Sequence, residues 1–270
     1  MGDAELNLLR RLIVDAAREE LLPRFNAVSH SFKADGSLIT EADLAMDARL
    51  HSELAHHWPE IGFLSEEMPA EEQEARLATG DAPWWCLDPL DGTNNFAAGL
   101  PAFAVSLALI EGGRPEIGLI YDPLRDECFS ARAGQGAWLN ELSLGPRCLH
   151  RPLAHAMALV DLKRLPRPLA SRIAEHPPYG SQRNFGSCAL EWVWMAAGRG
   201  HVCLHGGQKL WDYAAGTLIL EEAGGFSCTL EGDPVFRGGL APRSVVCALD
   251  PELFRSWCEW LEVRPAAPPG

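Results

Sequence analysis

Apolar residues recur along the chain in two rhythms, one typical of amphipathic helices and the other of buried strands. In residues 6–25 they follow each other three or four positions apart, which predicts a helix that ends near Pro23. A second helix is predicted to start after Thr40, a good capping residue, and to stop before Pro59. The polar stretch 30–36 between these helices is predicted to be a loop.

Short continuous apolar runs predict buried strands along most of the remaining chain. The runs in the first half cover residues 61–64, 85–87, 103–110, 116–121 and 127–131. The strands after 85–87 are predicted to form an antiparallel meander. The segment 68–82 is acidic and is predicted to be a loop with at most a helical turn. The second half alternates strands and helices, with strands at 157–160 and 201–204, a strand that runs into a turn over 182–188, helices near 169–174, 190–197 and 211–222, and further strands to Leu249. This alternation predicts a layered fold of the α+β type.

The stretch from Trp84 to Phe96 carries the most informative chemistry. Pro89 cannot donate to a strand ladder, so the strand is predicted to end there and to place Asp88 and Asp91 on a tight turn. Gly92 can adopt an unusual backbone conformation, and the residues after it suit a helix start. Two crowded carboxylates repel unless a cation lies between them, and oxygen ligands suit Mg²⁺. A solvated Asp-Gly turn is the alternative interpretation.

The charge and hydrophobic content of the chain limit the kinds of molecule that it is expected to bind. The chain has 270 residues, 47% of them hydrophobic, and a formal net charge of −14. Such a charge disfavours nucleic acid as a partner, and it would repel a phosphate substrate unless bound cations reverse the local sign. No apolar run approaches the roughly 20 residues of a membrane span, and the N-terminus lacks the features of a signal peptide. We therefore expect no membrane partner and a cytoplasmic location.

Eight cysteines are present, and none forms a Cys-x-x-Cys pair. This spacing disfavours zinc and thioredoxin-type sites. In a cytoplasmic setting we expect free thiols, several of them buried as small hydrophobic side chains.

Four motifs, in a consistent order, resemble those of the inositol monophosphatase family. The Asp-Pro-Leu-Asp-Gly-Thr-Asn-Asn-Phe stretch of 88–96 resembles its first signature, and Trp211-Asp212-Tyr213-Ala214-Ala215-Gly216 with the Glu-Ala-Gly-Gly of 222–225 resembles its second. The Glu-Glu pair after residues 63–65 and the Thr-x-x-Asp of 40–43 resemble two further family motifs. The chain thus looks like a Mg²⁺-dependent, Li⁺-sensitive phosphomonoesterase.

The resemblance implies a fold and an assembly. The fold would be the layered α-β-α-β-α sandwich of inositol monophosphatases and fructose-1,6-bisphosphatases. Residues 1–140 would form an N-terminal α+β lobe, with 134–140 matching the segment that ends it, and residues 141–264 a C-terminal α/β lobe. Residues 265–270, rich in Pro and Ala, are predicted to be a disordered tail. A homodimer is also implied.

The resemblance also implies roles for individual residues. Two to three Mg²⁺ ions would be held by side chains and one backbone carbonyl, contributed by Glu66, Asp88, Leu90, Asp91 and Asp212. Asp43 and Thr93 would position the attacking water, with Glu66 as the third catalytic candidate. Substrate contacts are expected from Asp91, Gly92, Thr93, Gly186, Ser187, Cys188, His205 and Asp212. Lys33, in the 30–36 loop, matches a basic residue of a segment that closes over the metal site, although a disordered connector fits this loop equally well.

The expected reaction is hydrolysis of a small phosphate monoester by a metal-activated water. Inositol 1-phosphate and related sugar, polyol or amino-alcohol phosphates are the first candidates. Histidinol phosphate, fructose 1,6-bisphosphate and 3′-phosphoadenosine 5′-phosphate remain alternatives, as does a regulatory binding protein on the same scaffold.

One position departs from the family pattern. Animal inositol monophosphatases carry an acidic residue where this chain has His205, which is followed by two glycines and Lys209. An imidazole cannot supply the same pair of anionic acceptors. We therefore hypothesise that the substrate is not restricted to myo-inositol 1-phosphate; an exposed turn without substrate contact is the alternative.

Overall fold

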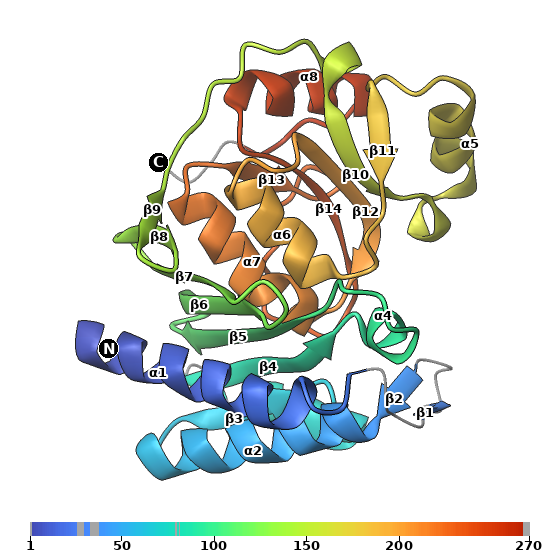
Figure 1. The fold of residues 1–270 in the computed structure, drawn as a ribbon. Helices are drawn as coiled ribbons and strands as arrows, with labels where there is room; N and C mark the ends of the chain where they lie inside the picture. The colour runs from blue at the N-terminus through green and yellow to red at the C-terminus, as the bar shows by residue number, and fades with distance from the viewer. Residues whose placement is uncertain (1, 26–29, 33–37, 79, 81, 267–270) are drawn as a thin grey trace.

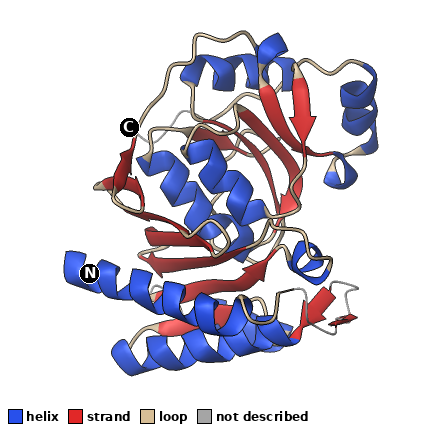
Figure 2. Ribbon diagram, in the orientation of Figure 1, coloured by secondary structure: helices blue, strands red, loops and turns tan. Residues whose placement is uncertain are grey.

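Helices and two β-sheets alternate in layers (Figure 1, Figure 2). The computed structural model describes residues 2–25, 30–32, 38–78, 80 and 82–266. A pair of helices covers the outer face of the first sheet, a second pair lies between the two sheets, and a C-terminal helix covers the outer face of the second sheet. The predicted α-β-α-β-α layering is therefore confirmed.

The first sheet has seven strands in the order β3-β4-β5-β6-β7-β8-β9. The pair β3 and β4 is parallel and all later pairs are antiparallel, which confirms the predicted meander. The strands are β3 (Gly62–Ser65), β4 (Trp84–Asp91), β5 (Ala104–Glu111), β6 (Arg114–Asp122), β7 (Glu127–Arg132), β8 (Gly136–Leu139) and β9 (Leu142–Leu144). A tight turn of two left-handed glycines, Gly112 and Gly113, joins β5 to β6.

Two N-terminal helices pack on the outer face of this sheet. The first, α1 (Asp3–Ala16), continues into a π-helical turn, η1 (Ala17–Leu21), and ends just before Pro23. The second, α2 (Glu41–His57), is capped by Thr40 as predicted. Their buried side chains form one apolar cluster with residues of β4, β5 and β6. Burying both helices along a continuous face fixes the position of Asp43 in the first turn of α2.

The second sheet has five strands in the order β11-β10-β12-β14-β13, with parallel and antiparallel pairs. Its strands are β10 (Met157–Asp161), β11 (Ser181–Arg183), β12 (Val202–Gln208), β13 (Phe226–Cys228) and β14 (Arg243–Ala248). The helices of this half are α5 (Arg167–Glu175), α6 (Cys188–Ala196), α7 (Leu210–Glu222) and α8 (Pro251–Leu261). Short 3-10 turns η2 (Leu153–His155) and η3 (Leu162–Arg164) flank β10.

The helices α6 and α7 lie between the sheets because small residues let the backbones approach closely. A Cβ atom on Gly216 of α7 would lie 2.3 Å from Cγ of Trp192 on α6. A Cβ atom on Gly118 of β6 would lie 2.7 Å from the carbonyl oxygen of Ala215. The glycine that ends the Trp-Asp-x-Ala-Ala-Gly motif is therefore required for packing, and this packing holds the start of α7 against the first sheet.

Three local predictions were wrong. Residues 30–32 are not part of a loop: β1 (His30–Phe32) pairs antiparallel with β2 (Leu38–Thr40), and this pairing satisfies hydrogen-bonding groups of the backbone. Lys33 and the rest of the predicted loop lie outside the described residues. The acidic segment after Met68 forms α3 (Ala70–Leu77), longer than one turn. Its acids face water and complement the helix dipole, while Gln73 is buried and donates to the Ser65 carbonyl at 2.8 Å.

The third wrong prediction is the end of the central strand. β4 runs through Pro89 to Asp91 instead of stopping at the proline. The ladder to β5 shifts register between Asp88 and Asp91, and a proline is tolerated at such a bulge because no ladder hydrogen bond is lost there. The unusual backbone conformation predicted as open to Gly92 is observed: the residue is left-handed, with φ of 92°, and α4 (Thr93–Ala97) follows it.

The C-terminal helix α8 was missed by the sequence analysis. Its N-terminus is capped by Asp250, which accepts hydrogen bonds from the N–H groups of Glu252 and Leu253. Buried Leu253, Trp257, Cys258 and Leu261 at helical spacing join the larger apolar cluster. Ala266, near the end of the described chain, donates to the Gly232 carbonyl at 2.8 Å, and residues 267–270 lie outside the described part.

Two lobes remain our proposal for the domain organisation, with each lobe built on its own sheet. The first sheet extends slightly past the proposed boundary at residue 140, because β9 pairs with β8. Among the described residues, none of the helices is long and apolar enough to cross a bilayer.

Replacing Gly216 with Ala is expected to destabilise the protein. The added methyl group would overlap the Trp192 ring, and overpacking of this kind costs about 1–3 kcal/mol even though Ala favours a helix. Urea unfolding of Gly216→Ala measures the effect. The matched control is Gly145→Ala, since no described heavy atom lies within 4 Å of a Cβ atom there. Equal stability of the two variants would contradict this account of the packing.

Candidate active site at the junction of the lobes

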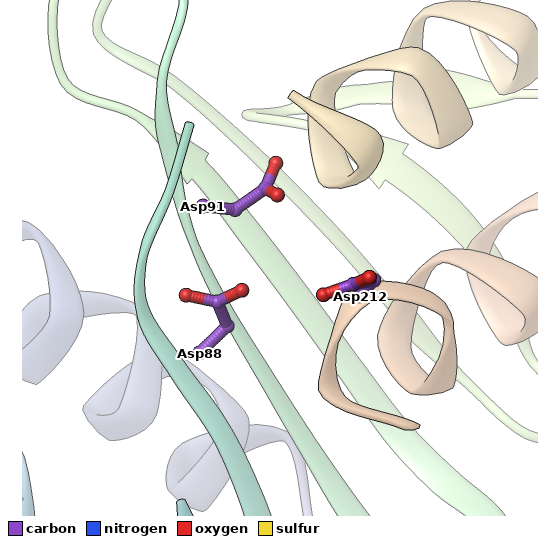
Figure 3. A group of neighbouring side chains, drawn as sticks. All are labelled: Asp88, Asp91 and Asp212. Atoms are coloured by element: carbon purple, nitrogen blue, oxygen red, sulfur yellow. The ribbon is translucent and has the colours of Figure 1, made fainter. Parts of the chain in front are cut away.

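Three carboxylates meet where the strand β4 faces the start of α7. Asp88 and Asp91 project from β4 toward Asp212 on α7 (Figure 3). One carboxylate oxygen from each lies within 4.8 Å of one from each of the others. The two aspartates of β4 are buried, with exposed fractions of 1% and 8%, and Asp212 is partly buried. We call this group the aspartate trio.

The bulge in β4 explains how two of these carboxylates point the same way. Side chains alternate between the faces of a regular strand, so residues three apart would lie on opposite faces. Asp88 pairs with Ser106 and Asp91 with Ala104, so β4 advances three residues while β5 advances two. The extra residue at Pro89-Leu90 restores both carboxylates to one face. In addition, the Leu90 N–H donates to Asp88 Oδ1 at 3.0 Å and so orients that carboxylate.

Asp91 is held by residues at the start of α6. The Ser187 hydroxyl and the Ala189 N–H, the latter at 2.8 Å, donate to Asp91 Oδ2, and the Cys188 N–H donates to Oδ1 at 3.2 Å. These donors lie at the start of α6, where N–H groups have no partner within the helix. Asn95 adds a second tie, since its amide donates to the carbonyls of Ala102 at 2.7 Å and Phe185 at 2.6 Å.

Asp212 lies in the first turn of α7 and accepts a hydrogen bond from the Lys209 N–H at 2.8 Å. A carboxylate at this position also complements the helix dipole. The preceding residue, Trp211, uses its carbonyl to accept from the Ser106 hydroxyl at 3.0 Å, which fixes the helix start to β5 beside Asp88.

Burial and mutual repulsion make the ionised form of the three carboxylates unfavourable, and a bound cation would relieve this. Burial, then the charges of Glu66, Asp91 and Asp212, raise the pKa of Asp88 well above its usual value. Burial likewise raises the pKa of Asp91 to about 6, against the opposing hydrogen bonds from α6, and raises the pKa of Asp212. Buried hard oxygen donors that repel one another are the ligand set that a divalent cation such as Mg²⁺ prefers. The residues present therefore fit the metal.

Glu66 lies beside the trio but outside the tight group of oxygens. It follows β3, which is parallel to β4, and its N–H donates to the Leu87 carbonyl at 3.1 Å. Its charge contributes to the raised pKa of all three aspartates. The preceding Ser65 donates to Asp47 Oδ1, and its hydroxyl accepts from the Glu67 N–H at 3.2 Å. Asp47, which the sequence analysis did not single out, thus supports the turn that presents Glu66.

Asp43 and Thr93 form a pair next to the end of β4, where Leu90 lies. Thr93 Oγ1 lies 3.1 Å from Asp43 Oδ1 and 3.0 Å from the Leu90 carbonyl oxygen. Asp43 is 2% exposed, and its Oδ2 accepts from the Thr40 N–H at 2.8 Å and the Thr40 hydroxyl at 2.6 Å. The capping box of α2 therefore fixes a carboxylate within hydrogen-bonding distance of the Thr93 hydroxyl.

Gly92 lies close to the segment that contains Ser187, and Gly186 lies close to Asn95 in the segment that follows Gly92. A Cβ atom on Gly92 would lie 2.9 Å from the Ala102 carbonyl oxygen and 3.3 Å from Ser187 Cβ. Gly186 has φ of 69°, and a Cβ atom there would lie 3.3 Å from Asn95 Nδ2. Both glycines are needed where the two lobes meet at the trio.

The remaining predicted substrate residues lie next to the trio on the second lobe. Cys188, the first residue of α6, has its Sγ 3.8 Å from His205 Nε2. His205 is buried in β12, accepts from the Gly207 N–H at Nδ1 (3.1 Å), and has Nε2 3.3 Å from Asp161 Oδ2. Asp161 was not identified from the sequence, because nothing in its local context indicates that β10 lies beside β12.

Known proteins resemble this chain over most of its length. The family model described as the inositol monophosphatase family matches residues 7–260. A protein named Nus factor SuhB from Haemophilus influenzae is 35% identical over 231 residues, 83% of this chain and 85% of its own. An inositol-1-monophosphatase from Mesorhizobium japonicum is 34% identical over 247 residues, 85% of this chain and 86% of its own. The crystal structure of the extragenic suppressor protein SuhB from Bartonella henselae superposes with a TM-score of 0.82, at 28% identity, over 96% of this chain and 99% of that one.

A buried carboxyl of α6 should make stability depend on pH. Glu191 is 3% exposed and accepts from the Phe185 N–H at 3.0 Å, and burial raises its pKa from 4.5 to about 7. The folded protein therefore keeps a proton that the unfolded chain releases. The stabilisation that comes from this preference for protonated Glu191 is fully present below pH 4.5 and is lost as the pH rises through about 7.

Glu191→Gln removes the titration and can still accept the Phe185 N–H. The free energy of unfolding of the variant should match wild type near pH 5 and exceed it by up to about 3 kcal/mol at pH 8. Both proteins are compared by urea unfolding at saturating Mg²⁺. Glu259→Gln, on the exposed face of α8, is the control and should follow wild type at every pH. A difference for Glu191→Gln that stays constant with pH would refute this assignment.

Proposed function

The chain belongs to the inositol monophosphatase family, and we propose that it hydrolyses a small phosphate monoester with Mg²⁺ as its cofactor. The single observation that carries this proposal is the aspartate trio, three neighbouring and mutually repelling carboxylates, two of them buried and the third partly buried. A regular core would not retain such a group without a cation, and a cation held there would attract phosphate despite the net charge of −14.

We propose that two to three Mg²⁺ ions are held by the trio together with two further groups, the Glu66 carboxylate and the Leu90 carbonyl. When bound, these ions neutralise phosphate charge and make water a better nucleophile at neutral pH. The fold holds these ligands in position. The bulge of β4 turns Asp88 and Asp91 to the same face, and backbone N–H groups at the starts of α6 and α7 orient Asp91 and Asp212.

Asp43 and Thr93 are proposed to orient the attacking water. When the Thr93 hydroxyl donates to Asp43 Oδ1, its oxygen can accept a hydrogen bond from a water molecule. Asp43 is anchored by both donors of Thr40, which hold its carboxylate in place to accept from the Thr93 hydroxyl. The water is thereby turned with a lone pair toward phosphorus, which lowers the entropic cost of the attack. Glu66, near the trio, remains the third catalytic candidate.

The N–H groups of Gly92 and Thr93 are proposed to donate to phosphate oxygens. Gly92 has a left-handed backbone that only glycine adopts easily, and it opens α4 beside the trio. Gly186, Ser187 and Cys188 would border the alcohol portion of the substrate from the second lobe. We propose inositol 1-phosphate or a related sugar, polyol or amino-alcohol phosphate as substrate, in a cytoplasmic homodimer. Histidinol phosphate, fructose 1,6-bisphosphate and 3′-phosphoadenosine 5′-phosphate remain the alternatives within the same chemistry.

A regulatory role is the second candidate function. It is favoured by relatives, such as the Haemophilus influenzae protein, that bear the name of a Nus factor rather than of an enzyme. The two candidates differ in what they require of the trio, because only hydrolysis depends on the charge of every metal ligand.

Asp212→Asn tests the hydrolytic proposal with two measurements. The amide oxygen can still accept from the Lys209 N–H, so the helix start is preserved while one metal-binding charge is lost. Phosphate release should fall at least about a hundredfold. The rise in melting temperature on adding Mg²⁺ should shrink too, since that rise reports binding to the folded state.

The control for this experiment is Asp233→Asn, an exposed aspartate. It should retain wild-type turnover and the full Mg²⁺-induced rise in melting temperature. Wild-type protein that releases no phosphate from any phosphomonoester, yet binds Mg²⁺, would favour the regulatory candidate instead.

Lithium should inhibit phosphate release in the millimolar range. A small hard cation suits the oxygen ligands of the trio, where it could hold product phosphate after bond cleavage. Titration with LiCl is compared with NaCl at equal ionic strength. Activity that responds identically to both salts would remove this claim and leave the hydrolase proposal standing.

A further inference from the structure

A row of contacts leads from the aspartate trio to a carboxylate outside the proposed set of metal ligands, Asp161. Cys188 donates through its N–H to Asp91 Oδ1 at 3.2 Å, and its Sγ lies 3.8 Å from His205 Nε2. His205 Nε2 in turn lies 3.3 Å from Asp161 Oδ2. Only Cys188 and His205 thus separate Asp161 from the trio. A phosphate at the trio would place the alcohol portion of a small substrate along this row.

The topology of the second sheet brings these residues together. β10 and β12 are parallel neighbours, and Asp161 is in register with His205. Paired residues of parallel strands point to the same face, and contact with Cys188 identifies it as the face covered by α6. Asp161 is also the last residue of β10, and ligands of α/β sheets bind beyond the carboxyl ends of parallel strands.

His205 itself has little to offer a substrate. It is 4% exposed, and both ring nitrogens already have partners. Because Nδ1 accepts from the Gly207 N–H, the ring proton of the neutral imidazole lies on Nε2 and is directed at Asp161. The same geometry excludes a Cys-His-Asp nucleophile: the basic lone pair is occupied by Gly207, and burial raises the pKa of the Cys188 thiol.

Asp161, by contrast, is both oriented and accessible. Its Oδ1 accepts from the Lys163 N–H at 2.9 Å and its Oδ2 faces His205, while its side chain keeps 15% of its surface exposed. A carboxylate has about four acceptor positions, so positions remain for a ligand. The hydrogen bond with His205 lowers the pKa of Asp161, which is therefore an anion at neutral pH.

We propose that Asp161 is the specificity residue that accepts hydrogen bonds from hydroxyl groups of a polyol or sugar phosphate, with His205 as its positioning residue. The nearby Arg164 decides between substrate classes. Its Nε lies 3.6 Å from Asp161 Oδ2, and its side chain is 58% exposed. This guanidinium repels the ammonium of an amino alcohol, whereas a hydroxyl can donate to Asp161 and accept from Arg164 at once. Amino-alcohol phosphates are thus the disfavoured class.

This inference rests on the proposed hydrolase function, and three substrates separate the two claims. Myo-inositol 1-phosphate carries hydroxyls, phosphoethanolamine carries an ammonium, and phenyl phosphate carries neither. The Mg²⁺-loaded wild-type protein should prefer the first over the second. Asp161→Ala should lower kcat/KM for the inositol phosphate about 10- to 100-fold, mainly through KM, because hydrogen bonds to a charged acceptor are lost. The kcat/KM of Asp161→Ala for phenyl phosphate should equal that of the wild-type protein.

Two further variants test the positioning role of His205. His205→Gln keeps an N–H donor that can reach Asp161, and it should retain most of the activity on inositol phosphate. His205→Leu removes the donor and should raise KM for that substrate as Asp161→Ala does, again without changing phenyl phosphate hydrolysis. Asp161→Asn serves as the less disruptive replacement if the alanine variant has a lowered melting temperature.

Lys163→Ala is the matched control, since it lies in the same 3-10 turn, is exposed, and keeps the N–H that Asp161 accepts. It should leave the substrate preference as it is in wild type. Equal losses on inositol phosphate and phenyl phosphate in Asp161→Ala, or no loss on either, would overturn the inference while the hydrolase function stands. A wild-type preference for phosphoethanolamine would overturn it too. Failure of the proposed function would instead appear as wild-type protein that hydrolyses none of the three.

Discussion

The bulge between Asp88 and Asp91 is the constraint on which the site depends. Two carboxylates three residues apart on a regular strand would face opposite layers, one toward α2 and one toward α7. The extra residue in β4 turns both to the same face, and Pro89 can occupy it because its missing N–H is not needed there. The Asp-Pro-Leu-Asp order therefore has a geometric reason that does not depend on the metal. It places like charges together in a buried position, and the rest of the molecule holds them there.

The second lobe supplies most of that restraint. Asp91 takes donors from three consecutive residues, Ser187 to Ala189, and Asp212 arrives on a helix that glycines allow to lie close to the first sheet. The start of α6 is itself held by buried Glu191 through Phe185. Charge repulsion within the trio thus acts against the same contacts that join the lobes. A cation at the trio would relieve that repulsion, so metal binding and lobe association are expected to stabilise one another.

Sequence reasoning reached the chemistry more easily than the geometry. The residue types of 88–96 already indicate a divalent metal, and most strands and helices were predicted from apolar periodicity. The bulge was missed because it is defined by the register of β5, and the rule that proline ends a strand gave the wrong answer. The helix α8 did carry local signals, an Asp250 cap with Pro251 after it. Asp161 had none, since its meaning comes from a parallel neighbour that joins it only in the folded sheet.

The two parts of the proposed site, the aspartate trio and the row from Cys188 to Asp161, are therefore held in place by different kinds of contact. The trio relies on main-chain donors: Cys188 binds Asp91 through its N–H, and Lys209 binds Asp212 in the same way. Main-chain donors remain when a side chain changes, so a different side chain at 188 would still leave an N–H to donate to Asp91. The row from Cys188 through His205 to Asp161 is built from side chains instead, and it is joined to the trio by that N–H. A substitution along the row alters what the alcohol portion of a substrate meets, while the carboxylates of the trio keep their positions. This separation is a physical reason for one metal centre to serve different phosphate esters in proteins with the same fold.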